Sequence, residues 1–307
     1  LETYFSTAPR GFSSFLPAMK TWINKKLFTD DLIKKEIYKI DEKFTDDKLF
    51  FSEHHLSHAA AAFYPSNFEK AAVLCLDAVG ESITTSAWVG ESEILSPLWE
   101  INFPHSVGML YSSFTYYCGF KVNSGEYKLM GLAPYGKPIY YDTILKYLVE
   151  IKEDGSIIIN QDYFSYLEGS SMTNEKFSKL FGGPPRQPEA RITKREMDIA
   201  SSIQKVTEKI IINMASYTKK LTGAENLCLS GGVALNCVAN GNLIKSNLFK
   251  DIWIQPASGD AGSSLGCAFD AYFSGNSVPP SVIAPDTPKS PVMSTPVDLV
   301  LSFSELS

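Results

Sequence analysis

The strongest pattern of apolar and polar positions lies over residues 227–266. An apolar run ends at Leu229, a Ser-Gly-Gly turn occupies 230–232, and apolar positions then recur with the spacing of a helix. A second short apolar run, 252–254, meets another small-residue loop at 258–262, which opens a further helical pattern. The pattern predicts two consecutive strand–loop–helix units whose glycine loops stand side by side.

Upstream, three apolar or alternating runs at 71–76, 82–89 and 94–101 are separated by turn residues, which predicts an antiparallel meander. Helical periodicity follows over 107–117 and again over 193–217, where a Thr-Lys-Arg-Glu capping box opens the pattern. The predicted order is three strands, a helix, an insertion, a long helix and two strand–helix pairs. This α/β order is the half-domain pattern of the actin-like and sugar-kinase ATPases, the ASKHA fold.

The chain divides into three regions. Residues 1–70 are interpreted as the remainder of a first lobe, with one or two amphipathic helices within 12–40. Residues 71–275 are predicted to form a second, ATPase-like lobe with an insertion at about 119–195. Residues 276–307 are rich in proline and serine, and we expect them to be poorly ordered.

The composition is that of a soluble globular protein, with 44% hydrophobic and 20% charged residues. A formal net charge of -6 gives no electrostatic footprint for nucleic acid or an anionic membrane. No apolar run reaches the ~18 residues of a membrane span. The cysteines are odd in number and lack C-x-x-C spacing, so they are interpreted as buried thiols in a reducing, cytoplasmic compartment, with no zinc site. They are Cys75, Cys118, Cys228, Cys237 and Cys267.

Two histidines at helical spacing suggest a metal site. His54 and His58 precede a run of alanines, so both imidazoles are expected on one face of a helix. The spacing alone is as compatible with packing as with a metal. Asp77, at the end of the next strand, and Asp260, in the second glycine loop, could complete the ligand set. Such a set would suit Fe(II), Mn(II) or Mg(II) and would clamp a polyphosphate.

The other two histidines have weaker signals. His55 points about 100° away from His54 around a helix, so a structural role is favoured. His105 follows Pro104 ahead of a helix, and its simplest interpretation is a residue of the first helical turn. A role for His105 in binding a substrate has no support from the sequence. No general base can be named.

The glycine loops predict a nucleotide site. Each loop puts backbone N–H groups and a helix N-terminus at the end of a strand, where a phosphate can approach. One isolated Gly-Gly is more often only a turn, but two loops in consecutive units favour a phosphate site. Neither loop is a P-loop or a G-x-G-x-x-G fingerprint. A side chain at Gly231 would fill the space that a phosphate needs. The loop residues predicted to contact the phosphates are Gly231, Gly232, Gly259 and Gly262. The spacing Asp77-x-x-Gly80-x-x-x-Thr84, at the first β-turn where the ASKHA fold holds a phosphate, adds Gly80 and Thr84.

Segment 125–136 mixes charged residues, aromatic residues and three glycines. Composition alone predicts a surface loop there. Ordering such a segment costs conformational entropy unless something binds to it.

Six motifs, in this order, resemble one known family: the O-carbamoyltransferases of the nodulation-factor and cephamycin or tobramycin type (NodU/CmcH). The resemblance covers roughly residues 1–275. The motifs are EHHLSHAA at 53–60, LDAVGE at 76–81, PHSVG at 104–108, GEYKLMGLAPYG at 125–136, SGGVALN at 230–236 and GDAG at 259–262.

The resemblance implies an ATPase-like domain, related to the enzyme that transfers threonylcarbamoyl to tRNA adenosine, followed by a YrdC-like domain. In this family, ATP and carbamoyl phosphate form carbamoyl adenylate, and the carbamoyl group passes to a substrate hydroxyl. By the matched motifs, His54, His58, Asp77 and Asp260 look like the metal ligands. The nucleotide contacts look like Ser230, Gly231, Gly232, Val233 and Asn236. The family's first strands and its YrdC-like region have no counterpart in this sequence, so the chain is interpreted as truncated at both ends.

The sequence therefore predicts part of an ATP-dependent O-carbamoyltransferase that binds ATP and a divalent metal. Its substrates would be carbamoyl phosphate and a hydroxyl-bearing small molecule, without nucleic acid or membrane. Two alternatives remain: a nucleotide-binding module without carbamoyl transfer, of the tRNA-modification type, and a sugar kinase. The acidic net charge counts against a tRNA partner.

Overall fold

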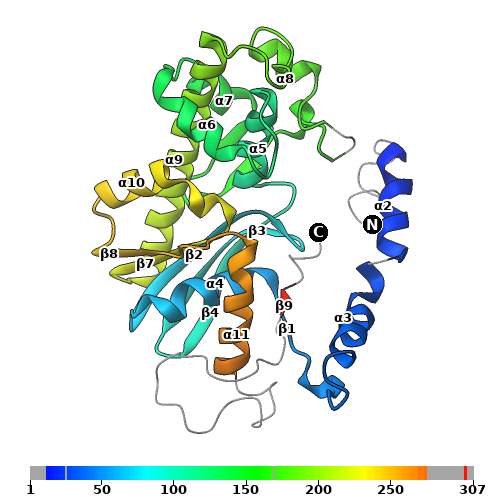
Figure 1. Ribbon diagram of the computed structural model, residues 1–307. Helices are drawn as coiled ribbons and strands as arrows, with labels where there is room; N and C mark the ends of the chain where they lie inside the picture. Colours follow the sequence, from blue (N-terminus) through cyan, green and yellow to red (C-terminus); the bar gives the residue numbers. More distant parts are fainter. Residues whose placement is uncertain (1–11, 25, 168, 170, 275–300, 303–307) are drawn as a thin grey trace.

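A five-stranded mixed sheet forms the centre of the computed structural model, which describes residues 12–24, 26–167, 169, 171–274 and 301–302 (Figure 1). The strand order is β4-β3-β2-β7-β8. Strands β2, β7 and β8 are parallel, whereas β3 is antiparallel to both β2 and β4. Hence β4 runs in the same direction as β2, and the carboxyl ends of four strands share one sheet edge. The bounds are β2 Lys70–Gly80, β3 Ile83–Glu91, β4 Ile94–Asn102, β7 Asn226–Ser230 and β8 Asp251–Ile254.

The predicted meander and the two strand–loop–helix units are confirmed, with one difference in length. Strand β2 runs four residues beyond the predicted end at residue 76, through Asp77 to Gly80. The pairing register with β3 shifts between Leu76 and Gly80, because the strand is irregular there. Asp77 therefore lies within an irregular strand end rather than in a free loop.

Helices cover both faces of the sheet (Figure 1). Helices α4 (His54–Phe63) and α11 (Ser263–Ser274) pack together on one face, over a core that includes Phe63 and Val73. They cross closely, because a Cβ added to Gly266 would lie 1.7 Å from the carbonyl oxygen of Ser57. The other face is covered by α5 (Val107–Tyr117), α9 (Lys194–Thr222) and α10 (Cys237–Lys245). The predicted capping box of α9 is confirmed at Thr193 and Glu196.

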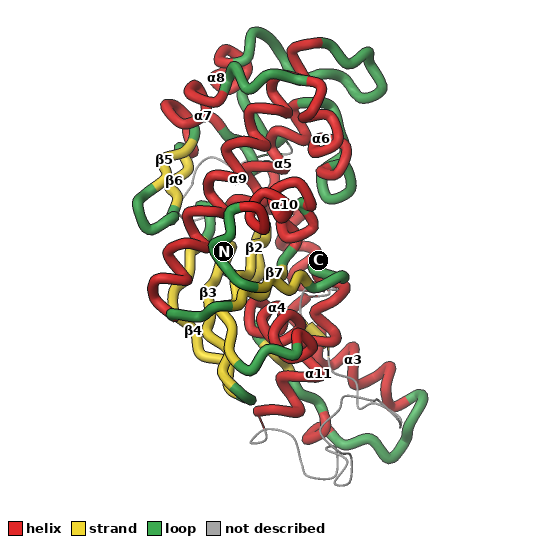
Figure 2. Tube along the Cα trace, turned by 90° about the vertical axis from the view of Figure 1, so that its left-hand side faces the viewer, coloured by secondary structure: helices red, strands yellow, loops and turns green. Residues whose placement is uncertain are grey.

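The segment between α5 and α9 forms a lobe at one end of these two helices (Figure 2). Its elements are α6 Glu126–Leu132, α7 Tyr141–Tyr147, β5 Val149–Ile151, β6 Ile157–Ile159 and α8 Glu175–Leu180. Rings from α5 and α8 pack edge to face, with the centroids of Phe114 and Phe177 5.1 Å apart. The lobe thus shares one core with the helices that cover the sheet.

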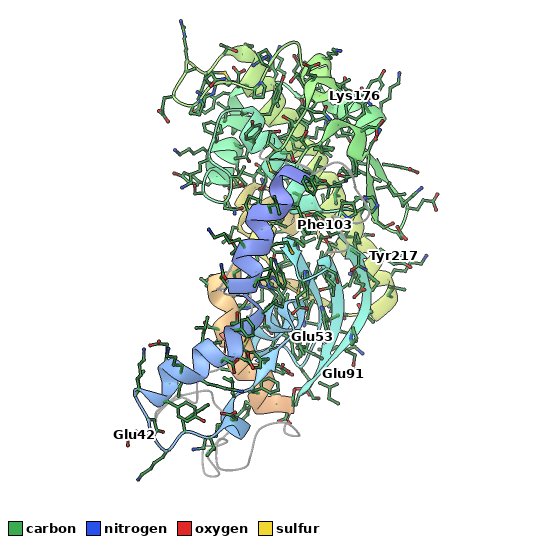
Figure 3. All side chains as sticks on the ribbon, turned by 90° about the vertical axis from the view of Figure 1, so that its right-hand side faces the viewer. Glu42, Glu53, Glu91, Phe103, Lys176 and Tyr217 are labelled. Atoms are coloured by element: carbon green, nitrogen blue, oxygen red, sulfur yellow. The ribbon has the colours of Figure 1, made fainter. Side chains whose placement is uncertain are left out.

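The N-terminal segment contains two helices, α2 (Phe12–Asn24) and α3 (Thr29–Tyr38), as the sequence predicts. Figures 1 and 3 show them standing beside the sheet rather than on it. The short strand β1 (Phe51–Ser52) pairs with β9 (Leu301–Ser302). The prediction of a poorly ordered tail otherwise falls outside the described residues. The short 3-10 helices are η1 Lys26–Phe28, η2 Asp46–Lys48, η3 Tyr64–Ser66, η4 Ala133–Tyr135, η5 Gln161–Tyr163, η6 Gly232–Leu235 and η7 Asp260–Gly262.

Candidate metal and nucleotide site

Four side chains that are far apart in the sequence converge at the carboxyl edge of the sheet. The ligand atoms of His54, His58, Asp77 and Asp260 all lie within 4.8 Å of one another. His54 Nε2 is 2.9 Å from Asp77 Oδ2 and 3.1 Å from His58 Nε2. Asp260 Oδ1 is 3.6 Å from His54 Nε2 and 3.4 Å from His58 Nε2. The helix predicted for the two histidines is present as α4, and both lie in its first five residues.

The distances fit a single ion. Ligands held about 2.1 Å from a metal lie about 3.0–3.4 Å apart in octahedral or tetrahedral geometry. The separations that involve His54 or His58 run from 2.9 to 3.7 Å, close to this range. The histidines and Asp77 are buried, whereas the Asp260 side chain is 45% exposed. A metal bound there would be reachable from solvent on the Asp260 side, which is the arrangement of a site that also takes a substrate.

The pKa values show strong coupling within the cluster. Burial alone would lower the pKa of His58, but its contacts with Asp260 and Asp77 outweigh burial and raise the pKa to about 9. Burial would likewise raise the pKa of Asp77, yet the hydrogen bonds from His54 and His58 hold it well below its usual range. Asp77 is therefore a carboxylate at neutral pH, as a metal ligand must be.

Two serines hold His58 in place, one through its backbone and one through its ring. Ser230 Oγ donates to the carbonyl oxygen of His58 at 2.8 Å, which ties α4 to the end of β7. Ser263 Oγ lies 3.4 Å from His58 Nδ1. A hydrogen bond at Nδ1 leaves Nε2 free to face the cluster, which is the usual arrangement of a metal-binding histidine. The sequence analysis did not single out Ser263, because a serine at a helix start gives no signal for a partner 205 residues away.

His55 is structural, as the sequence favours. Its Nδ1 lies 2.8 Å from Ser86 Oγ and its Nε2 lies 3.1 Å from the carbonyl oxygen of Ile83. Trp88 Nε1 donates to the same serine oxygen. Burial lowers the pKa of His55 to about 4, so the ring is neutral. This network fastens the start of α4 to β3.

The first glycine loop reaches the metal cluster through its backbone. Gly232 N–H donates to Asp77 Oδ1 at 3.3 Å. Gly231 has a φ of 86°, and an added Cβ would lie 2.2 Å from the carbonyl oxygen of Leu76. The expectation that a side chain at Gly231 would occupy phosphate space is therefore wrong: β2 already occupies that space. The second loop is open at Gly259, where the nearest atom to an added Cβ is Leu235 Cδ1 at 3.9 Å.

Three predicted nucleotide contacts have side chains that already bond within the protein. Ser230 binds the His58 carbonyl, as described above. Thr84 Oγ1 donates to the carbonyl oxygens of Ile101 and His105. The amide of Asn236 exchanges two hydrogen bonds with the amide of Gln204, at 3.0 and 3.1 Å. These three side chains shape the loops. Of the other predicted contacts, Val233 is half-buried, and Gly262 packs against Ala257.

Segment 125–136 is ordered by its own contacts. Glu126 accepts hydrogen bonds from the N–H groups of Asn123 and Gly125, and Gly136 packs against the Met197 carbonyl of α9. Met130 Sδ lies 3.8 Å from Cys237 Sγ on α10. Cys237 is exposed, so the expectation of five buried thiols is wrong for this residue. It follows the N-cap of α10 instead of lying within an apolar run.

No described helix has the length and apolarity needed to cross a membrane.

Comparisons with known proteins agree with the resemblance in the sequence. An uncharacterized protein from Synechocystis is 56% identical over 274 residues, which cover 89% of this chain and 45% of that protein. The nodulation protein NolNO of Sinorhizobium fredii is 34% identical over 72% of this chain and 31% of its own length. NolO of Bradyrhizobium diazoefficiens is 35% identical over 70% of this chain and 37% of its own length. The chain thus spans less than half the length of these relatives.

Among solved structures, HypF of T. kodakarensis aligns with 70% of this chain and 35% of its own, at 15% identity and a TM-score of 0.35, too low to support an argument. The family model described as "Carbamoyltransferase N-terminus" matches residues 1–269. That match spans the candidate metal site, both glycine loops and the lobe between α5 and α9. The chain therefore belongs to the carbamoyltransferase family.

Proposed function

We propose that this chain is the metal- and nucleotide-phosphate-binding part of an ATP-dependent O-carbamoyltransferase. The full reaction would use ATP and carbamoyl phosphate to form carbamoyl adenylate, and would pass the carbamoyl group to a hydroxyl of a sugar or natural product. Nucleic acid and membrane have no part in it, and the proposed location is the cytoplasm. Membership of the carbamoyltransferase family supports the reaction class.

The observation that carries this proposal is the position of the cluster beside two glycine loops at the carboxyl ends of β2, β7 and β8. In open α/β sheets, ligands bind outside the carboxyl ends of the strands. The loops add N–H groups near the cluster, and Gly232 N–H already points to a cluster carboxylate. We propose an ASKHA half-domain fold, and the strand order β4-β3-β2-β7-β8 with helices on both faces of the sheet supports this proposal.

The donor set indicates which metal would fit. Two imidazole nitrogens with two carboxylates suit Fe(II) or Mn(II) better than Mg(II), which prefers oxygen ligands and keeps several waters. A bound metal would supply positive charge for the phosphate of the adenylate. His54, His58 and Asp77 would hold it from the buried side, while Asp260 and the loop N–H groups would face the nucleotide. As the acceptor attacks and AMP departs, the charge of the metal and the loop N–H groups would offset the charge on the leaving phosphate.

Metal analysis tests the proposal. The purified protein should bind one divalent transition metal, and His54→Ala or His58→Ala should lower its affinity about tenfold or more. Glu53→Ala is a matched control, because Glu53 is exposed, directly precedes the same helix and makes no side-chain cap hydrogen bond. Elemental analysis would contradict the proposal if it found equal metal content in wild type and in the double mutant His54→Ala/His58→Ala.

A further inference from the structure

His105 lies on the same sheet edge as the metal cluster. It follows β4, whose carboxyl end is at that edge because β4 and β2 run in the same direction. Figure 3 shows Phe103, just beyond β4, at the opposite end of the sheet from Glu91, where β3 ends. Two contacts fasten this segment to its neighbours: Thr84 Oγ1 donates to the His105 carbonyl at 2.5 Å, and Ser106 Oγ donates to the Ala78 carbonyl at 2.6 Å. Ala78 is the residue after Asp77, so the His105 backbone is fixed beside the strand end that carries a cluster carboxylate.

The His105 ring is held in one tautomer. The N–H of Ile159 donates to His105 Nδ1 at 3.1 Å, so Nδ1 is an acceptor without a proton. Burial lowers the pKa of His105, and the neutral ring then carries its proton on Nε2. Nε2 has no hydrogen-bond partner within the described part of the chain. Since Nε2 is protonated, it can donate a hydrogen bond but cannot take up a proton, which excludes the role of general base for the neutral ring.

We propose that His105 Nε2–H is a substrate-contacting donor to the carbonyl oxygen of the carbamoyl group. This inference rests on the proposed function. The sheet order puts β4 on the opposite side of β2 from β7 and β8, the strands that lead into the glycine loops. With the adenylate phosphate at the loops and the metal, the proposal places the carbamoyl group on the β4 side of the phosphate and the adenosine on the β8 side.

The chemistry needs a donor at that oxygen. The acceptor oxygen forms a bond to the carbamoyl carbon, the bond from that carbon to the phosphate oxygen breaks, and AMP leaves with the electron pair. The proton of the acceptor hydroxyl is released to solvent. Negative charge builds on the carbamoyl oxygen during attack, and a donor fixed in place before the reaction stabilises it. His105 is fixed in this way by its backbone and by Nδ1.

A purely structural role would use the same Nδ1 contact, because that contact fastens β6 to the segment after β4. Two substitutions separate the roles. In His105→Asn, Oδ1 stands where Nδ1 was and can accept from Ile159, but the donor at the Nε2 position is lost. In His105→Gln, Nε2 stands near the position of the imidazole Nε2, but the acceptor for Ile159 is lost.

The experiment compares two ligands by calorimetry on the metal-loaded, full-length protein. AMP carries the phosphate alone, and 5′-O-(N-carbamoylsulfamoyl)adenosine is a stable mimic of carbamoyl adenylate. We expect His105→Asn to keep the Tm and the AMP affinity of wild type, and to bind the mimic roughly tenfold more weakly. His105→Gln should have a lower Tm and keep more of the affinity for the mimic.

Two outcomes would overturn the assignment. In the first, His105→Asn binds the mimic as tightly as wild type does. In the second, His105→Asn loses affinity for AMP and for the mimic equally, which would place the donor on the phosphate. Wild-type protein that binds neither ligand would refute the proposed function, and this inference with it. A loss of Tm in His105→Asn as large as in His105→Gln would show that the Asn does not preserve the Ile159 contact. The assignment would then be rejected if His105→Gln lost as much affinity for the mimic as His105→Asn does.

Discussion

The ring of His54 lies against Gly80, with no room for a side chain between them: a Cβ added to Gly80 would be 2.0 Å from His54 Cδ2 and 2.6 Å from its Nε2. Gly80 does not have the positive φ that excludes other residues. The glycine is therefore required by the imidazole beside it. The spacing Asp77-x-x-Gly80, predicted to belong to a phosphate loop, has a direct role in placing a candidate metal ligand.

Gly80→Ala should therefore displace the His54 ring and lower metal affinity about tenfold or more. Gly131→Ala is the matched control, because an added Cβ there meets nothing within 4 Å. The control should bind metal as wild type does and gain about 0.5–1 kcal/mol of stability from the better helix former. Metal titration calorimetry measures both variants. Unchanged metal affinity in Gly80→Ala would show that the ring has another position in which it can still bind.

The two glycine loops should respond differently to substitution. Gly231→Ala should destabilise the fold by about 2 kcal/mol or more, because the residue has a φ of 86° and its Cβ would collide with Leu76. Gly259→Val should fold normally, since its backbone is extended and the space beside it is open. If that space takes a phosphate, Gly259→Val should weaken AMP binding. Urea unfolding and calorimetry separate the two effects, and wild-type AMP affinity in Gly259→Val would remove the second loop from the site.

Removing one partner of the buried amide pair of Gln204 and Asn236 should lower the free energy of unfolding and leave metal binding unchanged. Gln204 is 4% exposed, and it bonds with Asn236, Tyr111 and Glu208. Gln204→Met keeps the size of the side chain but leaves these partners without a bond, which should cost about 1–3 kcal/mol. Lys209→Met, on the exposed side of the same helix, should change the free energy of unfolding by less than about 0.5 kcal/mol. Urea unfolding measures the free energy of unfolding of both variants. Equal losses in Gln204→Met and Lys209→Met would mean that the hydrogen-bond network does not stabilise the fold.

The sequence predicted the elements of the fold because its apolar periods are long and its turns are clear, as in β2, β3, β7 and α9. The spacing of His54 and His58 indicated that both lie on one face of a helix, and the matched family motifs added Asp77 and Asp260; the four side chains do converge. The sequence could not show that Ser230 bonds to His58, 172 residues away, or that Asn236 pairs with Gln204. A small polar residue in a glycine loop has the same sequence signal whether it faces a ligand or the neighbouring helix.

The chain spans less than half the length of its relatives, which leads to a prediction about residues 1–307 on their own. Residues 1–307 should bind metal and, weakly, AMP, because the cluster and both loops lie within them. With ATP and carbamoyl phosphate they should release no pyrophosphate, because we propose that activation uses parts of the longer relatives that this chain does not span; the chain covers 45% of its Synechocystis relative. A pyrophosphate assay on the chain and on the Synechocystis relative tests this. Comparable rates would place the activation chemistry in this chain.

Cys237 provides a chemical probe of the first glycine loop, the proposed phosphate site. It is the exposed cysteine among the described residues and directly follows Asn236 at the start of α10. The other cysteines are buried, and burial raises the pKa of Cys75, Cys118 and Cys228 to about 12, which removes their reactive thiolate. A disulfide reagent should therefore label one thiol quickly in the native protein and all five after denaturation.

Cys237→Ser should abolish the fast phase of labelling, which identifies the reacting thiol. If the loop before α10 binds a phosphate, AMP with metal should slow the labelling of wild type, because the bound nucleotide covers the start of the helix. Adenosine, which lacks the phosphate, is the control and should protect much less. Rapid labelling of two or more thiols would contradict the burial of the other cysteines. An unchanged rate at saturating AMP would place the nucleotide away from the start of α10, and with it the phosphate site away from the first glycine loop.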